Sequence, residues 1–163
     1  MTIALIGLSQ TINAQKSHPD KFINRLKKDP SAVAITLPGW FVKAGGRIAA
    51  RSADTEDAYF LKELTGSIKK LRFVVTQEES SSYAKELSLL KVHMEERGYE
   101  NLLNVSEEDT HIDLWAIYDQ DKVKRMVVSI LEDEDSHAFF NIKCDIDVDK
   151  LKSKDFYKEW ESM

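Results

Sequence analysis

The spacing of apolar residues changes along the chain from a helical period to an alternating one. Over residues 77–98, apolar side chains recur every three or four positions, which is typical of a helix with one buried face. They are Tyr83, Leu87, Leu90 and Met94. Thr76 and Glu79 have the spacing of a capping box, and Gly98 is suited to end the helix in the left-handed conformation. We therefore predict one long amphipathic helix in this region.

Residues 99–146 instead alternate between apolar and polar side chains, as strands do when a sheet has two different faces. Polar, turn-like stretches separate four such runs, which read YENLLNVS, HIDLWAIYD, VKRMVVSIL and HAFFNIKCDI. Because short connections make consecutive strands antiparallel, we predict a four-stranded meander.

The first half of the chain predicts further helices and strands. Ser17 is suited to cap a helix that ends before Pro30, and the sequence AVAITL at 32–37 favours a strand. Residues 40–50 fit a helical face, but the glycine pair at positions 45 and 46 weakens a helix by about 1 kcal/mol per glycine. A helix over 54–66, a strand at 71–75 and a C-terminal helix follow. The apolar side of that last helix consists of Phe156, Tyr157 and Trp160.

These elements predict an α+β fold. Its largely antiparallel sheet consists of the C-terminal four-strand meander and one or two N-terminal strands, packed with helices. At 163 residues, with 42% hydrophobic and 31% charged residues, the chain is long enough to bury a core without disulfide or metal staples. We expect one domain over residues 15–163.

The opening stretch MTIALIGLSQTINAQ is apolar, carries no charged side chain and is followed by a highly charged segment. An apolar core followed by small residues is the order found in a secretory signal peptide, although the basic start is missing. We interpret residues 1–14 as a truncated signal peptide, with Ala14 as the last residue removed. The alternative is an ordinary buried strand or helical turn. The run is too short to span a bilayer, which requires about 20 apolar residues.

The even-numbered positions of the last three predicted strands are almost wholly apolar. They include Leu114, Val128 and Ile142. We expect the helix at 77–98 to cover this face of the sheet. The other face would then point away from that helix.

The odd-numbered face mixes polar side chains with large apolar ones, and it is too apolar for the exposed face of an antiparallel sheet. One interpretation is that other segments with aromatic residues fold over it. These are residues 40–50, 60–64 and 156–160. The other interpretation is a docking patch of Trp115, Phe139 and Arg125, because tryptophan and arginine concentrate at binding hot spots.

Trp40 is the fourth candidate binding residue. A small molecule or lipid could lie in a pocket between residues 40–50 and the sheet, because the glycine pair at 45 and 46 would allow close approach or movement of the backbone there.

Signatures of catalysis and of cofactor binding are not visible in the sequence. It has no phosphate-binding loop, dinucleotide-binding glycine pattern, His-Glu-x-x-His helix or Gly-x-Ser-x-Gly elbow. The alternating acids of DIDVD lack the glycine and glutamate that a calcium loop requires. Cys144 is in phase with apolar strand residues, so we expect it to be buried. We expect no catalytic residue, no cofactor and no metal site, and a hydrolase assembled in the tertiary structure stays open as a third possibility.

The chain resembles the uncharacterised exported proteins of Bacteroidetes that form the "domain of unknown function" family 4252. The resemblance runs from Asp20 to Leu151 and rests on several stretches in order. These are NAQ at the end of the opening segment, DKF, AVAITLPGWF, IKKLRFVV, ERGYENLLNV and IKCDIDVDKL. It implies an envelope address and a small α+β domain, and it transfers no active-site residue because that family has no established one. The chain departs from the family pattern in its short apolar leader.

We therefore expect a non-enzymatic domain, exported to the periplasm or cell envelope, that works by contact with an envelope protein. The formal net charge of -5 argues against a nucleic-acid backbone or an anionic membrane surface as the main partner. The oligomeric state is left open.

Overall fold

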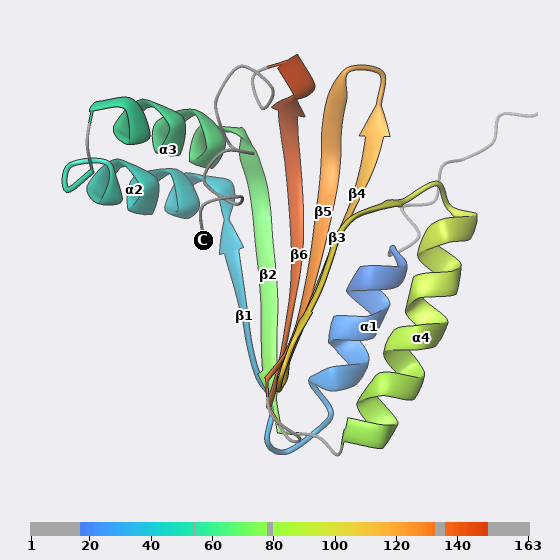
Figure 1. Cartoon of the computed structure of the whole chain (residues 1–163). Coiled ribbons are helices and arrows are strands. Elements are labelled where there is room, and N and C mark those ends of the chain that lie inside the picture. Colours follow the sequence, from blue (N-terminus) through green and yellow to red (C-terminus); the bar gives the residue numbers. More distant parts are fainter. Residues whose placement is uncertain (1–16, 54, 78–79, 133–135, 150–163) are drawn as a thin grey trace, which may run out of the picture.

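The computed structural model describes residues 17–53, 55–77, 80–132 and 136–149 of the chain. The described elements, in chain order, are α1 (His18–Leu26), β1 (Val33–Pro38), α2 (Gly39–Ala49), α3 (Thr55–Ser67), β2 (Ile68–Thr76), α4 (Ser80–Glu96), β3 (Glu100–Glu107), β4 (Thr110–Asp119), β5 (Lys122–Glu132) and β6 (Ser136–Asp147). The six-stranded sheet has the order β1-β2-β6-β5-β4-β3, and all neighbouring strands are antiparallel (Figure 1). The predicted α+β class is confirmed, with the meander β3–β6 joined by two N-terminal strands.

The first helix begins where the sequence predicts. The Ser17 side chain accepts a hydrogen bond from the backbone N–H of Asp20, and Pro19 lies in the first turn, where its missing N–H costs nothing. The helix ends at Leu26, before Pro30, and its apolar stripe is buried.

The long helix agrees with its prediction at its end. Thr76 is the last residue of β2, where it pairs with His137. Because Glu79 lies outside the described residues, the predicted capping box of Thr76 and Glu79 stays a prediction. The helix begins at Ser80. Gly98 follows its last turn with a φ of 85°, which confirms the left-handed ending.

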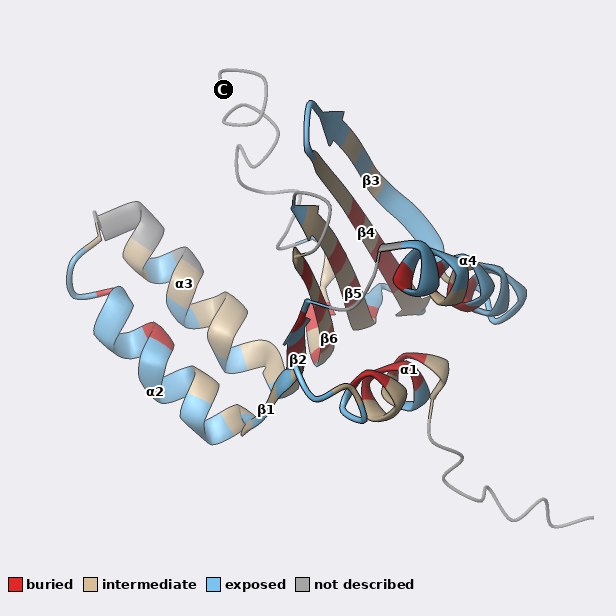
Figure 2. Ribbon diagram, turned by 90° about the horizontal axis from the view of Figure 1, so that it is seen from below, coloured by how far each residue is buried: buried red, intermediate tan, exposed pale blue. Residues whose placement is uncertain are grey.

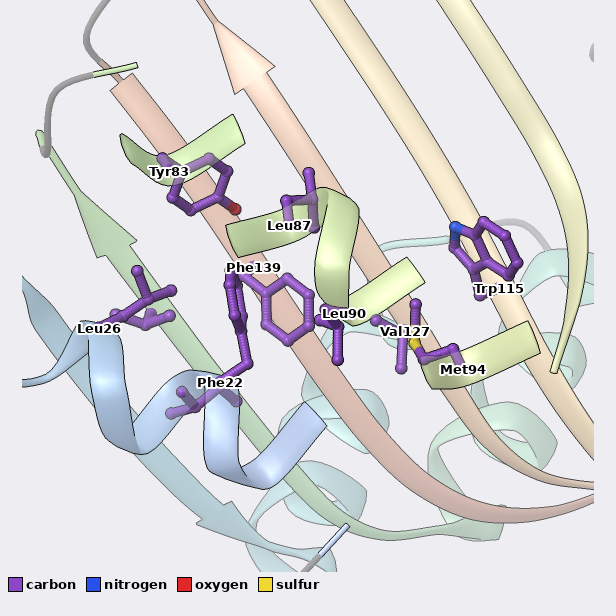
Figure 3. Packing of buried hydrophobic residues seen from close by; sticks show 11 residues of the cluster. Phe22, Leu26, Tyr83, Leu87, Leu90, Met94, Trp115, Val127 and Phe139 are labelled. Carbon is purple, nitrogen blue, oxygen red and sulfur yellow. The ribbon is translucent and has the colours of Figure 1, made fainter. Parts of the chain in front are cut away.

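The helices α1 and α4 lie side by side on one face of the sheet, whereas α2 and α3 form a hairpin on the other side, near β1 and β2 (Figures 1 and 2). The main core lies under α1 and α4 (Figure 3). Its buried members are Phe22, Ile23, Leu26, Val74, Tyr83, Leu87, Leu90, Met94, Trp115, Val127 and Phe139.

This core corrects the expected orientation of the sheet. The long helix covers the odd-numbered face with Trp115, Val127 and Phe139, and it does not cover the even-numbered face. Because both faces are rich in apolar residues, their apolar content alone could not decide between them. Polar contacts from the two helices to the odd-numbered face accompany this orientation.

None of the described helices is long and apolar enough to cross a membrane. The opening segment 1–14 and the aromatic tail with Phe156, Tyr157 and Trp160 lie outside the described residues. The predictions of a signal peptide and of a C-terminal helix therefore stay predictions.

Candidate interaction surface

The even-numbered face of β4–β6 continues across β1–β3 as one apolar surface, which we call the open face. Strand pairing aligns its side chains in rows that cross the six strands. The first row is Val33, Val75, Ala138, Ile130, Ile112 and Val105. The second is Ile35, Phe73, Phe140, Val128, Leu114 and Leu103. The third is Leu37, Leu71, Ile142, Met126, Ala116 and Glu100, so Glu100 at the β3 edge is the one polar residue in the rows.

Described residues cover one end of the open face. There Leu64 of α3 and Ile68 pack against a second buried cluster. Its buried members are Ala116, Val123, Cys144 and Ile146. The first two rows lie away from this cluster, and at the β1 and β2 edge Val33 is 61% exposed, Ile35 41% and Val75 39%. A monomer seldom leaves so large a contiguous apolar patch in water, so the open face is a candidate contact surface.

The α2–α3 hairpin joins the sheet through close backbone contacts. A Cβ atom at Gly39 would lie 2.4 Å from the carbonyl oxygen of Ile68, so the start of α2 is pressed against β2. A Cβ atom at Gly46 would lie 2.0 Å from Oγ1 of Thr65, so α2 touches α3 at a point where only glycine fits without a shift. The region that the sequence left ambiguous is thus a helix whose glycine serves close packing.

The structure does not bring the four predicted binding residues together on one surface. Trp115 is 6% exposed and Phe139 is 0% exposed, both in the core beneath α1 and α4 (Figure 3). Arg125 lies on the same face, where it is part of a polar network with α1. Trp40 is 72% exposed on α2, on the other side of the sheet. Of the segments that we expected over the odd-numbered face, residues 40–50 and 60–64 belong to α2 and α3, whereas α1 and α4 pack on that face. The third segment, 156–160, lies outside the described residues.

The polar network centres on Asp20 of α1. Arg72 donates to Oδ1 of Asp20 at 2.6 Å, and Arg125 donates to Oδ2 at 3.2 Å. Asn141 donates to Oδ1 at 3.0 Å, and the hydroxyl of Ser17 donates to Oδ2 at 2.7 Å. Burial raises the pKa of Asp20, but the hydrogen bonds from Ser17 and Arg72 and the charge of Arg125 outweigh it and hold the pKa below its ordinary value. The network ties α1 to β2, β5 and β6, and sequence spacing gave no signal for it.

A second polar cluster joins α4 to β3 and β4. Asp113, 1% exposed, accepts hydrogen bonds from Lys91 and from Nδ2 of Asn104, the latter at 2.6 Å. Nε2 of His111 lies 3.2 Å from the same carboxylate, and Nδ1 of His111 lies 2.5 Å from the hydroxyl of Ser106. Ser106, His111 and Asp113 are thus in contact in the order serine, histidine, aspartate of a hydrolase triad, but Nδ1 faces the serine and Nε2 the carboxylate, the reverse of the usual arrangement. Ser106 lies within strand β3, however, whereas a hydrolase serine sits on a sharp turn beside oxyanion donors.

The single cysteine is buried, as the strand alternation predicts. Its sulfhydryl donates to the carbonyl oxygen of Val123 at 3.4 Å. Burial, assisted by the nearby charge of Asp145, raises the pKa of Cys144 to about 11. The thiol is therefore protonated at neutral pH, where a nucleophilic cysteine would need its thiolate.

An open groove of about 500 Å³ lies between α1 and α4. It is lined by His18, Lys21, Arg25, Lys85, Glu86 and His93, together with apolar residues of the two helices. This groove is on the opposite face from the pocket that we considered between residues 40–50 and the sheet. In that segment the side chains of Phe41 and Ile48 are 50% and 66% exposed and face the solvent, away from the sheet. A ligand pocket between residues 40–50 and the sheet stays a prediction.

In the part of the chain that the structure describes, the fold and this surface define a class: an α+β domain whose antiparallel sheet carries two helices over one face and whose other, apolar face is covered by α3 at one end only. Residues 26–153 match the family model described as "Domain of unknown function (DUF4252)". The chain belongs to this family, in agreement with the resemblance noted in its sequence. A search of the curated proteins and a search of the solved structures found no match.

Proposed function

We propose that this protein is a non-enzymatic binding domain of the bacterial cell envelope that acts by protein contact through the open face. The observation that carries the proposal is the alignment of apolar side chains across all six strands, with Glu100 as the one polar residue in the rows. Apolar surface removed from water contributes roughly 25 cal/mol per Å², so burial of this face against a complementary surface would favour binding.

The dimensions of the open face indicate the kind of partner that fits. The first two rows, which lie away from the covered end, extend over about 30 Å by 14 Å across the six strands, from the usual strand and residue spacings. This is about half of one side of a standard protein–protein interface, which buries about 800 Å² per partner. Because the rows carry almost no charge, the partner should present a flat, uncharged apolar surface, such as another sheet or a pair of amphipathic helices.

The envelope address rests on the opening residues. Residues 1–14 have the apolar core and small-residue end of a secretory signal, and the highly charged segment follows directly. Cell fractionation with N-terminal sequencing of the mature protein tests it. A product found in the envelope that begins at Gln15 supports the address, and a cytosolic product that still begins at Met1 contradicts it.

The contact surface can be tested with matched variants. Ile35→Lys combined with Val75→Lys places charge on the exposed edge of the open face, where both side chains are partly in solvent. Leu89→Lys combined with Val92→Lys is the control, because these residues of α4 are 56% and 51% exposed and lie on the far side of the molecule. We expect capture of an envelope protein to be lost with the first pair and kept with the second.

Light scattering of the purified chain distinguishes self-association from binding of another protein. A dimer that the open-face pair dissociates would make a second copy the occupant. If both double variants are folded and capture every partner equally well, the open face is not the contact surface.

A hydrolase is the competing function, because His111 is hydrogen-bonded to Ser106 and its other ring nitrogen lies 3.2 Å from the carboxylate of Asp113. Lys91 already pairs with Asp113, which weakens the support that this carboxylate could give to a charged imidazole. We expect hydrolysis of a p-nitrophenyl ester to be equal in the parent and in Ser106→Ala. A loss of activity of about a hundredfold or more in the variant would favour the enzyme.

A further inference from the structure

We propose that α2 docks the protein on an anionic lipid surface. The contact is the apolar side of this helix, formed by Trp40, Phe41, Ala44 and Ile48, which we call the α2 stripe. The inference is independent of the protein contact through the open face, because it rests on different residues.

The α2 stripe is turned away from the rest of the molecule. At 100° per residue, Ala44 and Ile48 lie almost directly opposite Gly46, the residue that packs against Thr65 of α3. Trp40 and Phe41 flank them on either side. The side chains are accordingly exposed, with Trp40 at 72%, Phe41 at 50% and Ile48 at 66%.

Close packing fixes this orientation. A side chain at Gly46 would overlap Thr65, and one at Gly39 would overlap the backbone of Ile68, so α2 has backbone contacts at its start and near its end. Rotating the helix to bury the stripe would bring side chains into these positions. Trp40 and Phe41 instead contact each other edge to face, with ring centroids 5.6 Å apart.

The segment that contains the stripe has basic residues and no acidic ones. Lys43, Arg47 and Arg51 are exposed and lie along one side of the stripe, and every other residue between Asp29 and Asp54 is uncharged. This region is therefore basic within a chain whose formal net charge is -5. A helix with tryptophan and phenylalanine on one side and lysine and arginine beside them has the composition of helices that lie in the membrane interface.

The position of the helix suits such a contact. The α2–α3 hairpin projects from the sheet next to β1 and β2, on the face opposite α1 and α4 (Figure 2). A flat surface could therefore touch α2 without displacing the main core. With eleven residues, α2 is about 16 Å long, which allows shallow insertion of Trp40 and Phe41 and no crossing of the bilayer.

Vesicle sedimentation of the full chain tests the proposal. Vesicles of phosphatidylglycerol with phosphatidylcholine are compared with vesicles of phosphatidylcholine alone. We expect binding to the first, weakened by salt, and little binding to the second. Lys43→Glu with Arg47→Glu should weaken binding about thirtyfold or more, since each basic residue near an anionic surface contributes about a factor of five.

Two further variants distinguish binding through the α2 stripe from non-specific binding by exposed apolar side chains. Trp40→Ser with Phe41→Ser should weaken binding at least about tenfold, because these side chains enter the interface. Leu89→Ser with Val92→Ser removes similarly exposed apolar side chains from α4 and should leave binding unchanged. All variants carry the same opening segment, so differences between them report on the described surface.

Tryptophan fluorescence gives a direct readout. In a Trp160→Phe background, Trp115 is buried and Trp40 is exposed, so a blue shift on adding anionic vesicles reports insertion of Trp40. Equal binding to both vesicle types, unchanged emission, or full binding by the charge-reversed variant would overturn the proposal. If the parent protein binds no vesicles but captures an envelope protein that the Trp40→Ser, Phe41→Ser variant fails to capture, α2 is a protein contact and the proposal is wrong.

Discussion

At the residue scale, the carboxylate of Asp20 connects the first helix to three strands. Ser17 both caps α1 and donates to Asp20, while Arg72, Arg125 and Asn141 approach from the sheet. The sequence identified Ser17 as the cap and placed Arg125 on the correct strand face. It could not identify the partners, because these residues are far apart in the chain and meet only after the helix packs.

The pH dependence of stability tests the Asp20 network. Because the folded-state pKa of Asp20 is lowered, its carboxylate stabilises the fold above the ordinary value of 3.8, and this stabilisation is lost as the pH falls through the folded pKa. Asp20→Asn should lower the free energy of unfolding by about 1–2 kcal/mol at neutral pH, where it leaves Arg72 and Arg125 without their anion. Urea unfolding of both proteins should show this difference shrinking in acid. A difference that stays constant below the ordinary pKa would contradict the network.

The tryptophans provide a second test at this scale. Trp115→Ala should cost about 3–5 kcal/mol of unfolding free energy, because it opens a cavity under α4. Trp40→Ala should change stability by less than about 0.5 kcal/mol, since its side chain is 72% exposed. Thermal melting of both variants checks the pair, and equal losses would mean that the core has been assigned to the wrong face.

At the element scale, the hydrophobic period predicted the strands and the long helix, whereas the glycine pair left residues 40–50 undecided. Both outcomes have a physical cause. A strand pattern reports directly on two faces, but a glycine can either weaken a helix or permit a close contact. Gly46 permits a close contact with Thr65 of α3. Local sequence could not predict this contact, because Thr65 is 19 positions further along the chain.

The two glycines of α2 form a matched pair for testing the hairpin. Gly46→Ala should destabilise the protein by about 1–3 kcal/mol, because its Cβ atom would overlap the Thr65 side chain. Gly45→Ala should be stabilising by up to about 1 kcal/mol, because no atom lies within 4 Å of its Cβ position and alanine favours the helix. Urea unfolding measures both, and equal effects would show that α2 and α3 are not in close contact.

At the scale of the whole molecule, both faces of the sheet are rich in apolar residues, and α1 and α4 pack on the odd-numbered one. The alternation gave the members of each face except at the β5 bulge, where the odd-numbered Val123 packs with Ala116, Cys144 and Ile146. It could not assign the helices, because Leu114, Val128 and Ile142 are as apolar as their odd-numbered neighbours. The missed signal was the set of polar residues among the aromatics of the odd-numbered face, since Asp113 and Arg125 need the partners that Lys91 and Asp20 supply.

The most direct test of the open face is site-specific photocrosslinking in intact cells. A photoreactive side chain at position 35 lies on the exposed edge of the open face, and the same group at position 89 on α4 is the control. We predict a discrete crosslinked product of higher mass from position 35 and none from position 89. No product from position 35, or the same products from both positions, would contradict a protein contact on the open face.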